Sequence, residues 1–389
     1  SSSHISWKQK LRRSWGRLGM KSEWTYRPLG ELVSFASGGT PSKKRDDYWG
    51  GTIPWISAKT LKTENIDTSD LFITEEGLKA GSKIAPKGSI LLLTRGSGLF
   101  NGIPIARVEK DVAFNQDIKC LDSYGEVENE FIFYWLLSQK DYLMAKVGVT
   151  GIGAGKFDLD FLQKLMIPIP SERERKSIVG FASSISEKIR CNAKVNDNLE
   201  QQAVALFKSW FVDFSLFGGT VPENWEDTTL ENITTLITRG IAPKYSDNSD
   251  QTVVNQKCIR NHTIDLSLAR SHTPKAINEK WLQFGDLLIN STGDGTLGRV
   301  AQVWFAPKAL TVDSHVTIVR PAREELIFYI GLWGILHEKE IESLHTGSTG
   351  QTELPRDRVK MLKLLLPDNI SLSRFNSIIT PMASTIISN

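Results

Sequence analysis

The stretch Gly293-Asp-Gly-Thr-Leu-Gly298 matches the G-x-G-x-x-G pattern of loops that hold the pyrophosphate of a dinucleotide. Asp313 follows at a spacing that would suit a ribose-binding acid. A dinucleotide loop must open a helix, however, whereas the next residues, Arg299-Val-Ala-Gln-Val-Trp304, alternate like a strand. The pattern therefore predicts a tight turn between antiparallel strands, and a dinucleotide-dependent enzyme is the weakest hypothesis for this chain.

Other catalytic signatures are absent from the sequence. Lys156 follows a glycine, but Thr150 and Phe157 stand where a P-loop needs a glycine and a hydroxyl residue. The segment His337-Glu-Lys-Glu-Ile341 lacks the second histidine of a helical zinc site. No nucleophile elbow, methyl-transfer tetrapeptide or acidic nuclease signature occurs. We therefore predict no catalytic residue, no metal site and no cofactor, which favours a recognition or assembly protein.

Side chains that can contact nucleic acid stand instead in the variable loops of both halves of the chain. Arg, Lys, Asn and Gln hydrogen-bond base edges in pairs or hold phosphates. The candidates in the first half are Lys43, Lys44, Arg45, Ser57, Lys59, Arg95, Ser97, Asn115, Gln116 and Lys156. Those in the second half are Arg239, Lys244, Lys257, Arg260, Asn261, Arg299, Ser314 and His315. Each one alone is more simply a solvated surface residue, but as loop clusters they favour nucleic-acid binding.

Length and composition describe a globular chain. Its 389 residues predict two or three domains, and 40% apolar with 23% charged residues excludes a mostly disordered protein. The longest apolar run, Leu362–Pro367, is far shorter than a membrane helix, and no secretion signal is visible. Three scattered cysteines exclude a disulfide framework. We expect a soluble cytoplasmic protein.

The net charge of +3 is unevenly distributed. Residues 1–21 contain six bases and no acid, which leaves 41 bases against 44 acids in the rest of the chain. If translation starts at Met20, residues 1–19 are a non-native or dispensable extension. The body is not a polycation, so a DNA-binding role requires that its bases gather on one surface.

A repeat with an offset of 197 residues organises the chain. It matches glycines and prolines, whose backbone roles make chance agreement improbable. The matched pairs are Gly88 with Gly285, Gly96 with Gly293, Gly98 with Gly295, Gly153 with Gly350, and Pro170 with Pro367. The openings repeat as well, with Trp24 and Trp225 at an offset of 201. We interpret this as two diverged copies of one module.

Each copy predicts the same α+β order of elements. A short apolar strand (89–94 and 286–290) is followed by a Gly-rich loop and a short apolar helix (131–138 and 326–337). A second Gly-rich loop then leads to a strand that ends in proline (164–170 and 360–367). A helix must follow each proline.

The helix after the first copy is predicted to be unusually long. Ser171-Glu-Arg-Glu174 is typical of a helix start, and about 40 residues follow with apolar three- and four-residue spacing, or roughly 60 Å of helix. The spacing is that of a coiled-coil seam, and we expect it to bind a partner through Ile178, Phe181, Ile185, Ile189, Val195, Leu199, Leu206 and Trp210. The second helix begins in register but reaches only Asn389, about half the length.

Several segments resemble the specificity subunit of type I restriction-modification systems. The opening Leu29–Ser42 and the segment Tyr48–Ser57 are similar to the start of a target recognition domain. The strand from Lys87, the exit from Phe157 to Pro170, and the segment Leu199–Phe214 are also similar to that family. The resemblance covers roughly residues 22–389. Because the family's recognition loops vary most, it assigns a base-reading role to no single residue.

The resemblance implies two target recognition domains, at 22–170 and 215–367, after a basic extension at 1–21. Helices at 171–214 and 368–389 would separate them as an antiparallel coiled coil. Each domain would bind half of a bipartite site in double-stranded DNA. Methylation and cleavage would belong to other chains, namely methyltransferase subunits, expected in two copies, and restriction or motor subunits. The alternative is a scaffold of two protein-binding modules, with the long helix as a docking rod and no DNA readout.

Overall fold

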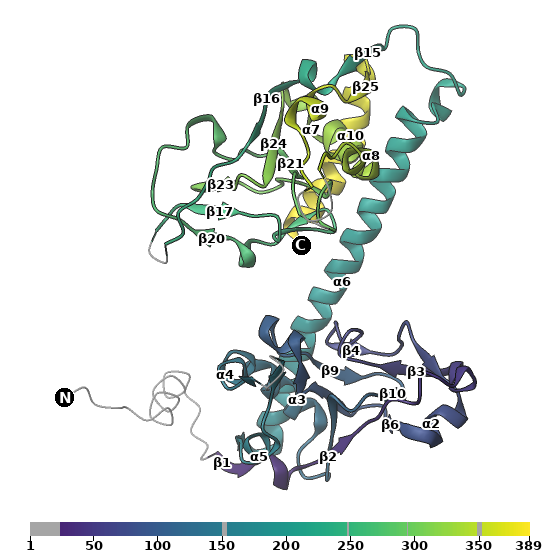
Figure 1. Ribbon diagram of the computed structural model, residues 1–389, viewed down its shortest axis with the longest axis vertical. Coiled ribbons are helices and arrows are strands. Elements are labelled where there is room, and N and C mark those ends of the chain that lie inside the picture. Colours follow the sequence, from purple (N-terminus) through teal and green to yellow (C-terminus); the bar gives the residue numbers. More distant parts are fainter. Residues whose placement is uncertain (1–23, 150–153, 247–248, 294, 348–351) are drawn as a thin grey trace, which may run out of the picture. The chain divides into compact units, whose positions relative to one another are not determined.

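The computed structural model describes residues 24–149, 154–246, 249–293, 295–347 and 352–389. The basic extension at 1–21 and the matched glycines Gly153 and Gly350 lie outside these ranges. The chain divides into two compact units, of which the first ends at Glu187 and the second begins at Lys188. The division falls within the long helix α6 (Glu172–Phe211) (Figure 1).

The core of the first unit forms around a five-stranded sheet. Its strand order is β2 (Val33–Ser37), β11 (Ile118–Ser123), β7 (Ile90–Leu93), β9 (Ile105–Val108) and β4 (Asn65–Ile66). Strand β7 is buried at every position, as the continuous apolar run of a central strand requires. Helix α3 (Asn129–Ser138) packs Phe131, Ile132 and Leu136 into the same core and is followed by α4 (Lys140–Met144).

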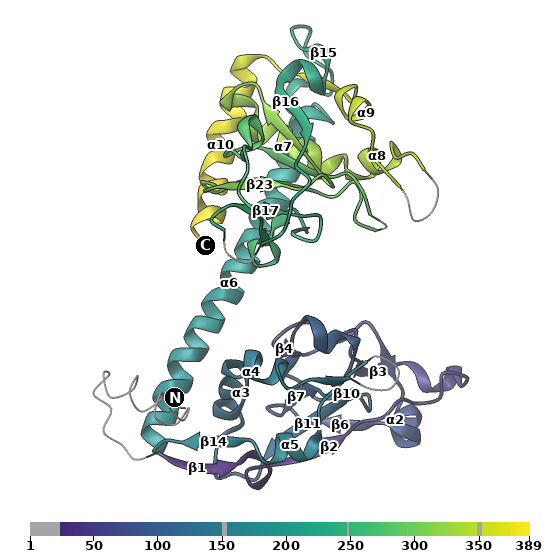
Figure 2. The ribbon, with the colours of Figure 1, turned by 60° about the vertical axis from the view of Figure 1, so that its left-hand side comes forward.

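Smaller sheets complete the first unit. Four strands, β5 (Phe72–Ile73), β3 (Trp49–Ile56), β10 (Val112–Phe114) and β6 (Lys83–Ala85), lie beside helix α2 (Glu75–Gly81). A ribbon joins β12 (Gly148–Val149), β13 (Gly155–Lys156) and β8 (Arg95–Gly96). After α5 (Leu159–Gln163), strand β14 (Met166–Ile169) pairs with β1 (Thr25–Pro28) and leads into α6 (Figure 2).

The second unit repeats this plan, which confirms the duplication. Its main sheet is β16 (Thr234–Arg239), β24 (Val316–Pro321), β21 (Leu287–Asn290) and β22 (Val300–Gln302). A smaller sheet joins β20 (Arg270–Ser271), β17 (Thr252–Val254) and β23 (Leu310–Val312), and β18 (Ile259–Arg260) pairs with β19 (Thr263–Ile264). Helices α7 (Ile327–Leu336), α8 (Glu338–Ser343) and α9 (Arg356–Lys360) precede the pair of β25 (Lys363–Leu366) with β15 (Glu226–Thr229).

Short 3-10 turns connect these elements. They are η1 (Leu29–Glu31), η2 (Asp46–Tyr48), η3 (Ser97–Asn101), η4 (Ser215–Phe217), η5 (Leu230–Ile233), η6 (Leu266–Leu268), η7 (Asn278–Lys280) and η8 (Glu324–Leu326). The Gly-rich stretch from Gly293 joins β21 to β22, which pair antiparallel. The amide of Gly298 closes the loop on the carbonyl of Asn290 at 2.9 Å. The predicted tight turn is confirmed.

The long helices have the predicted lengths, 40 residues for α6 and 20 for α10 (Asn369–Ser388). Ser171 and Glu174 form a reciprocal capping box at the start of α6, because each accepts a hydrogen bond from the other's main-chain amide. In the second unit α10 runs antiparallel to the end of α6, and Phe375 packs on Phe207 and Phe211 with ring centroids 6.1 and 4.8 Å apart. The predicted antiparallel helix pair is therefore present.

Candidate nucleic-acid interface

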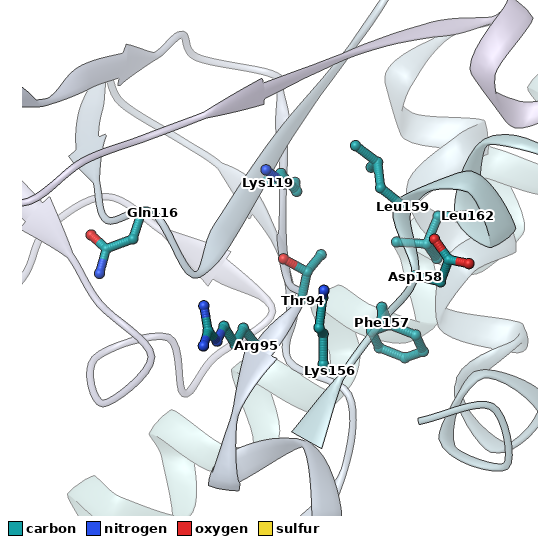
Figure 3. Close-up of a pocket in the computed structure, with 9 residues that line it drawn as sticks. All are labelled: Thr94, Arg95, Gln116, Lys119, Lys156, Phe157, Asp158, Leu159 and Leu162. Atoms are coloured by element: carbon teal, nitrogen blue, oxygen red, sulfur yellow. The ribbon is translucent and has the colours of Figure 1, made fainter. Parts of the chain in front are cut away.

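A basic pocket opens in the first unit beside the β12–β13–β8 ribbon. Its volume is about 300 Å³. The residues that line it are Thr94, Arg95, Gln116, Lys119, Lys156, Phe157, Asp158, Leu159 and Leu162 (Figure 3). Three residues predicted from the sequence, Arg95, Gln116 and Lys156, thus meet in one place although they stand on separate segments.

Arg95 and Lys156 lie directly opposite each other on paired strands. Like charges at such positions destabilise a strand pair. Among the residues that the structure describes, no carboxylate forms an ion pair with either side chain. Figure 3 shows the two side chains next to each other below Thr94. The arrangement therefore leaves two positive charges open to a negatively charged ligand.

Lys119 adds a third cation that the sequence analysis missed. It stands on β11 opposite Ser37 of β2, and its ammonium donates to the Ser37 hydroxyl. In the sequence it looks like an ordinary solvent-facing strand residue, and only the strand register reveals its position. The one carboxylate of the pocket, Asp158, accepts from the Asp160 amide at 3.0 Å, and Figure 3 shows it turned away from Lys156. The pocket is therefore net positive.

The remaining polar residue of the pocket, Gln116, lies at the β10–β11 turn. Its Oε1 accepts from the Thr40 hydroxyl at 2.7 Å, which orients an exposed amide. The neighbouring Asn115 is different, because it is 6% exposed and its amide closes its own turn. Its Oδ1 accepts from the Asp117 amide at 3.1 Å and its Nδ2 donates to Asp117 Oδ2 at 3.3 Å. The Asn115 side chain is thus engaged within its own turn, and its contact with DNA stays a prediction.

The other first-half candidates lie on turns outside this pocket. Lys43 and Lys44 are exposed, whereas Arg45 is bound to Asp47 by hydrogen bonds of 2.8 and 2.6 Å that hold the Asp47 pKa below its usual range. The Ser57 hydroxyl accepts from the amide of Lys59 at 3.3 Å. Ser97 begins η3. All of this group except Ser57 are exposed to solvent.

The second unit has a counterpart to the pocket with different chemistry. Thr292 and Glu353 form an antiparallel bridge at the positions that Arg95 and Lys156 occupy in the first unit. Arg239 Nη1 lies 2.6 Å from Glu353 Oε1, and its Nη2 donates to the carbonyl of Leu354 at 2.7 Å. These two contacts hold the Arg239 guanidinium within the unit, and its contact with DNA stays a prediction.

A hydrogen-bonded chain lies next to this ion pair. His315 Nδ1 lies 2.8 Å from the Thr292 hydroxyl, which donates to Gln256 Oε1 at 3.1 Å. Gln256 is a candidate that the sequence analysis missed, since nothing near it in the sequence marks it. Arg299 is held by a 2.6 Å hydrogen bond to the carbonyl of Gly295. Asp313, the ribose-binding candidate, is buried and caps the β24 turn through the His315 amide.

A separate hairpin presents Arg260 and Asn261 to solvent. Its turn has positive φ at Asn261 and His262, 48° and 58°. The His262 ring binds Glu200 of α6 through Nδ1 and lies 3.7 Å from Glu338 through Nε2. The hydrogen bond to Glu200, aided by Glu338, raises the pKa of His262 to about 9. The ion pairs of His262 therefore hold this hairpin against α6. The other two lysine candidates of the second half, Lys244 and Lys257, are exposed.

The apolar stripe of α6 splits into exposed and buried parts. Phe181, Ile185, Ile189 and Val195 are 71, 45, 65 and 44% exposed. Ile178 packs against the first core, and Leu199 is half-buried. Leu206 and Trp210 belong to the second core, where Trp210 lies 5.6 Å from the Phe375 ring. These two side chains therefore pack within the second unit, and their binding to a partner stays a prediction.

The sequence profile of the "Type I restriction modification DNA specificity domain" matches residues 21–201, which include the basic pocket and much of α6. Residues 21–201 therefore match the profile of this family, and the chain is similar to type I specificity subunits along most of its length. The resemblance seen in the sequence is therefore confirmed. The profile describes a DNA specificity domain, and the relatives below are named as specificity subunits of type I restriction enzymes.

Individual relatives support this assignment along the chain. The MjaIX specificity subunit of Methanocaldococcus jannaschii is 26% identical over 399 residues, which covers 94% of this chain and 88% of the relative. The EcoR124I/EcoR124II specificity subunit of Escherichia coli is 31% identical over 161 residues, 41% of this chain and 40% of the relative. The S subunit of the type I restriction-modification system from M. genitalium shares the fold, with a TM-score of 0.56 and 14% identity over 95% of this chain and 91% of that one.

Within the described ranges, no group of three or more His, Cys, Asp or Glu side chains is placed to hold a metal ion. No helix in the same ranges is long and apolar enough to cross a membrane.

Proposed function

We propose that this specificity subunit recognises a bipartite site in double-stranded DNA, with each unit reading one half. The observation that carries the proposal is the repeated scaffold with different loop chemistry. Corresponding paired positions hold Arg95 and Lys156 in the first unit but Thr292 and Glu353 in the second. Two copies of one scaffold with different contact residues suit two unlike half-sites.

The proposal is tested by replacing residues 222–366 with those of another specificity subunit. Only one half of the methylated sequence should change, as read by methylome sequencing of the host. The matched control replaces residues 29–170 instead and should change the other half. If either replacement alters both halves, the units do not read DNA separately.

We further propose that the exposed stripe of α6 docks two methyltransferase subunits in the cytoplasm, and that separate restriction or motor subunits perform cleavage. Phe181, Ile185 and Ile189 form an apolar stripe with a four-residue spacing, and all three side chains are open to solvent. A Phe181→Asp variant should lose the methyltransferase on co-purification, whereas Lys194→Asp, at an exposed site on the opposite face of the same helix, should keep it. Retention by both variants would place docking elsewhere.

The alternative, a two-module protein scaffold without DNA readout, makes a different prediction. The complex with methyltransferase would then give no footprint on duplex DNA that carries the methylated site. We expect protection of both half-sites, and loss of protection when either half-site is scrambled.

A further inference from the structure

Four positions that face one another in pairs recur in both units, and the residues at these positions differ in charge. In the first unit they hold Ser37, Lys119, Arg95 and Lys156. In the second unit the corresponding positions hold Arg239, Thr317, Thr292 and Glu353. The strand registers fix this correspondence, since Ser37 faces Lys119 as Arg239 faces Thr317. The first set carries three positive charges, whereas the second carries one of each sign.

We propose that the first-unit pocket binds one phosphate group of the DNA backbone, and that the Arg239–Glu353 ion pair excludes phosphate from the counterpart in the second unit. The choice of a DNA phosphate as the ligand rests on the proposed function, which is DNA binding by this chain. The pocket itself rests on the register, the charges and the contacts described above.

The charge arrangement of the first unit suits a phosphate. Arg95 and Lys156 repel each other across the strand pair, and a phosphate beside both would replace this repulsion with attraction. A guanidinium binds phosphate oxygens in pairs, while a lysine supplies a point charge. The pocket volume of about 300 Å³ is roughly ten times the share of one water molecule in the liquid, which leaves room for the group.

The second unit neutralises the same place internally. Glu353 stands where Lys156 stands in the first unit. Its carboxylate already forms an ion pair with the Arg239 guanidinium, with Oε1 2.6 Å from Nη1. A phosphate bound at this place would have to displace Glu353 from Arg239, and the Glu353 carboxylate would repel it. The first unit therefore anchors the backbone at this position, and the second contributes other contacts.

The first test measures salt dependence of DNA binding by the complex with methyltransferase. An Arg95→Ala/Lys156→Ala double variant should bind cognate and scrambled duplexes more weakly by the same factor. The slope of log affinity against log salt should fall in magnitude by about 0.9, the value for one phosphate contact. Glu353→Gln, which frees Arg239, should tighten binding to both duplexes and steepen the slope. The matched control, Lys79→Ala/Lys110→Ala, removes two exposed lysines outside the pocket and should leave the slope unchanged.

The second test needs no DNA. Inorganic phosphate is added to the full chain, and its ³¹P linewidth is followed by NMR. The parent chain should broaden the signal, and the Arg95→Ala/Lys156→Ala variant should not, while both keep the same melting temperature. Equal broadening by the two chains would show that the pocket does not bind phosphate.

The outcomes separate this inference from the proposed function. Specific binding with an unchanged salt slope in the pocket variant overturns the phosphate site but leaves DNA recognition intact. Loss of affinity for the cognate duplex alone would also overturn it, because it indicates base reading. If no variant or parent complex binds duplex DNA specifically, the proposed function fails, and the phosphate titration still decides whether the pocket binds the anion.

Discussion

Asn192 and Asn389 are counterparts in the 197-residue repeat, and they touch: Asn192 Nδ2 donates to the main-chain carbonyl of Asn389 at 3.0 Å. Asn389 Nδ2 also donates to Asn196 Oδ1 at 2.7 Å. The two contacts join the end of α10 to the middle of α6, while Phe375 packs near the end of α6. The antiparallel register therefore covers α6 from about Asn192 to Phe211 within the second unit.

Phe375 should be the residue on which this helix pairing depends most. It is fully buried among Phe207, Trp210 and Phe211. A Phe375→Ala variant should lose about 3–5 kcal/mol of unfolding free energy, because the cavity among aromatic rings cannot collapse fully. Urea denaturation measures the loss. Ile378→Ala, at a site 41% exposed on the same helix, should lose less than about 1 kcal/mol. Equal losses would contradict this packing.

Asp368 should stabilise the start of α10. Its carboxylate accepts from the amides of Ile370 and Ser371 at 2.8 and 3.0 Å and from Trp225 Nε1 at 2.8 Å. An Asp368→Ala variant should lose about 0.5–2 kcal/mol at neutral pH, and Asp368→Asn should lose less because asparagine also caps helices. Similar losses for the two variants would argue against the cap.

The same carboxylate gives a prediction for acid. Partial burial raises the pKa of Asp368, but hydrogen bonds led by the Ser371 amide lower it to about 2 from 3.8. Because the folded value is the lower one, the stabilisation is present above about pH 4 and is lost as the pH falls toward 2. The stability difference between the parent and Asp368→Ala should shrink over this window. A constant difference would show that the ionised form is not favoured.

The second unit should become less stable at alkaline pH, where His262 loses its proton. Its pKa is raised from 6.5 to about 9, first by the hydrogen bond to Glu200 and then by Glu338. The raised value means that the stabilisation is complete below about pH 6.5 and is lost as the pH rises through 9. A His262→Gln variant should lose about 1.5–3 kcal/mol at pH 6 and much less at pH 10. His345→Gln, at an exposed histidine, should behave like the parent at both values.

Arg260 should affect sequence preference rather than general affinity. It is exposed on the hairpin that His262 fixes to α6. An Arg260→Ala variant should lose about 1–3 kcal/mol on the cognate duplex and relax specificity at one base pair. Lys257→Ala should instead weaken all duplexes alike and lower the salt slope by about one. Fluorescence anisotropy with a panel of single-base variants distinguishes the two, and a uniform loss for Arg260→Ala would assign it to phosphate.

The sequence by itself determined the features that depend on near neighbours. The duplication shows at Gly88 and Gly285, because both need a positive φ, 87° and 88°, that other residues rarely adopt. The capping box from Ser171 and the length of α6 follow from spacing within a few residues. The turn at Gly293 was also predictable, since strand-like residues follow it directly.

Only the tertiary structure decided which polar residues are free. The Arg239–Glu353 pair and the Lys119–Ser37 pair join residues far apart in the sequence, and a shift of one residue in strand register would separate each of them. Trp210 looks like the apolar stripe before it, yet α10 buries it. The N-cap Asp368 of α10 accepts hydrogen bonds both from the first-turn amides and from the distant Trp225. Such contacts arise from packing of distant segments, so local spacing does not encode them.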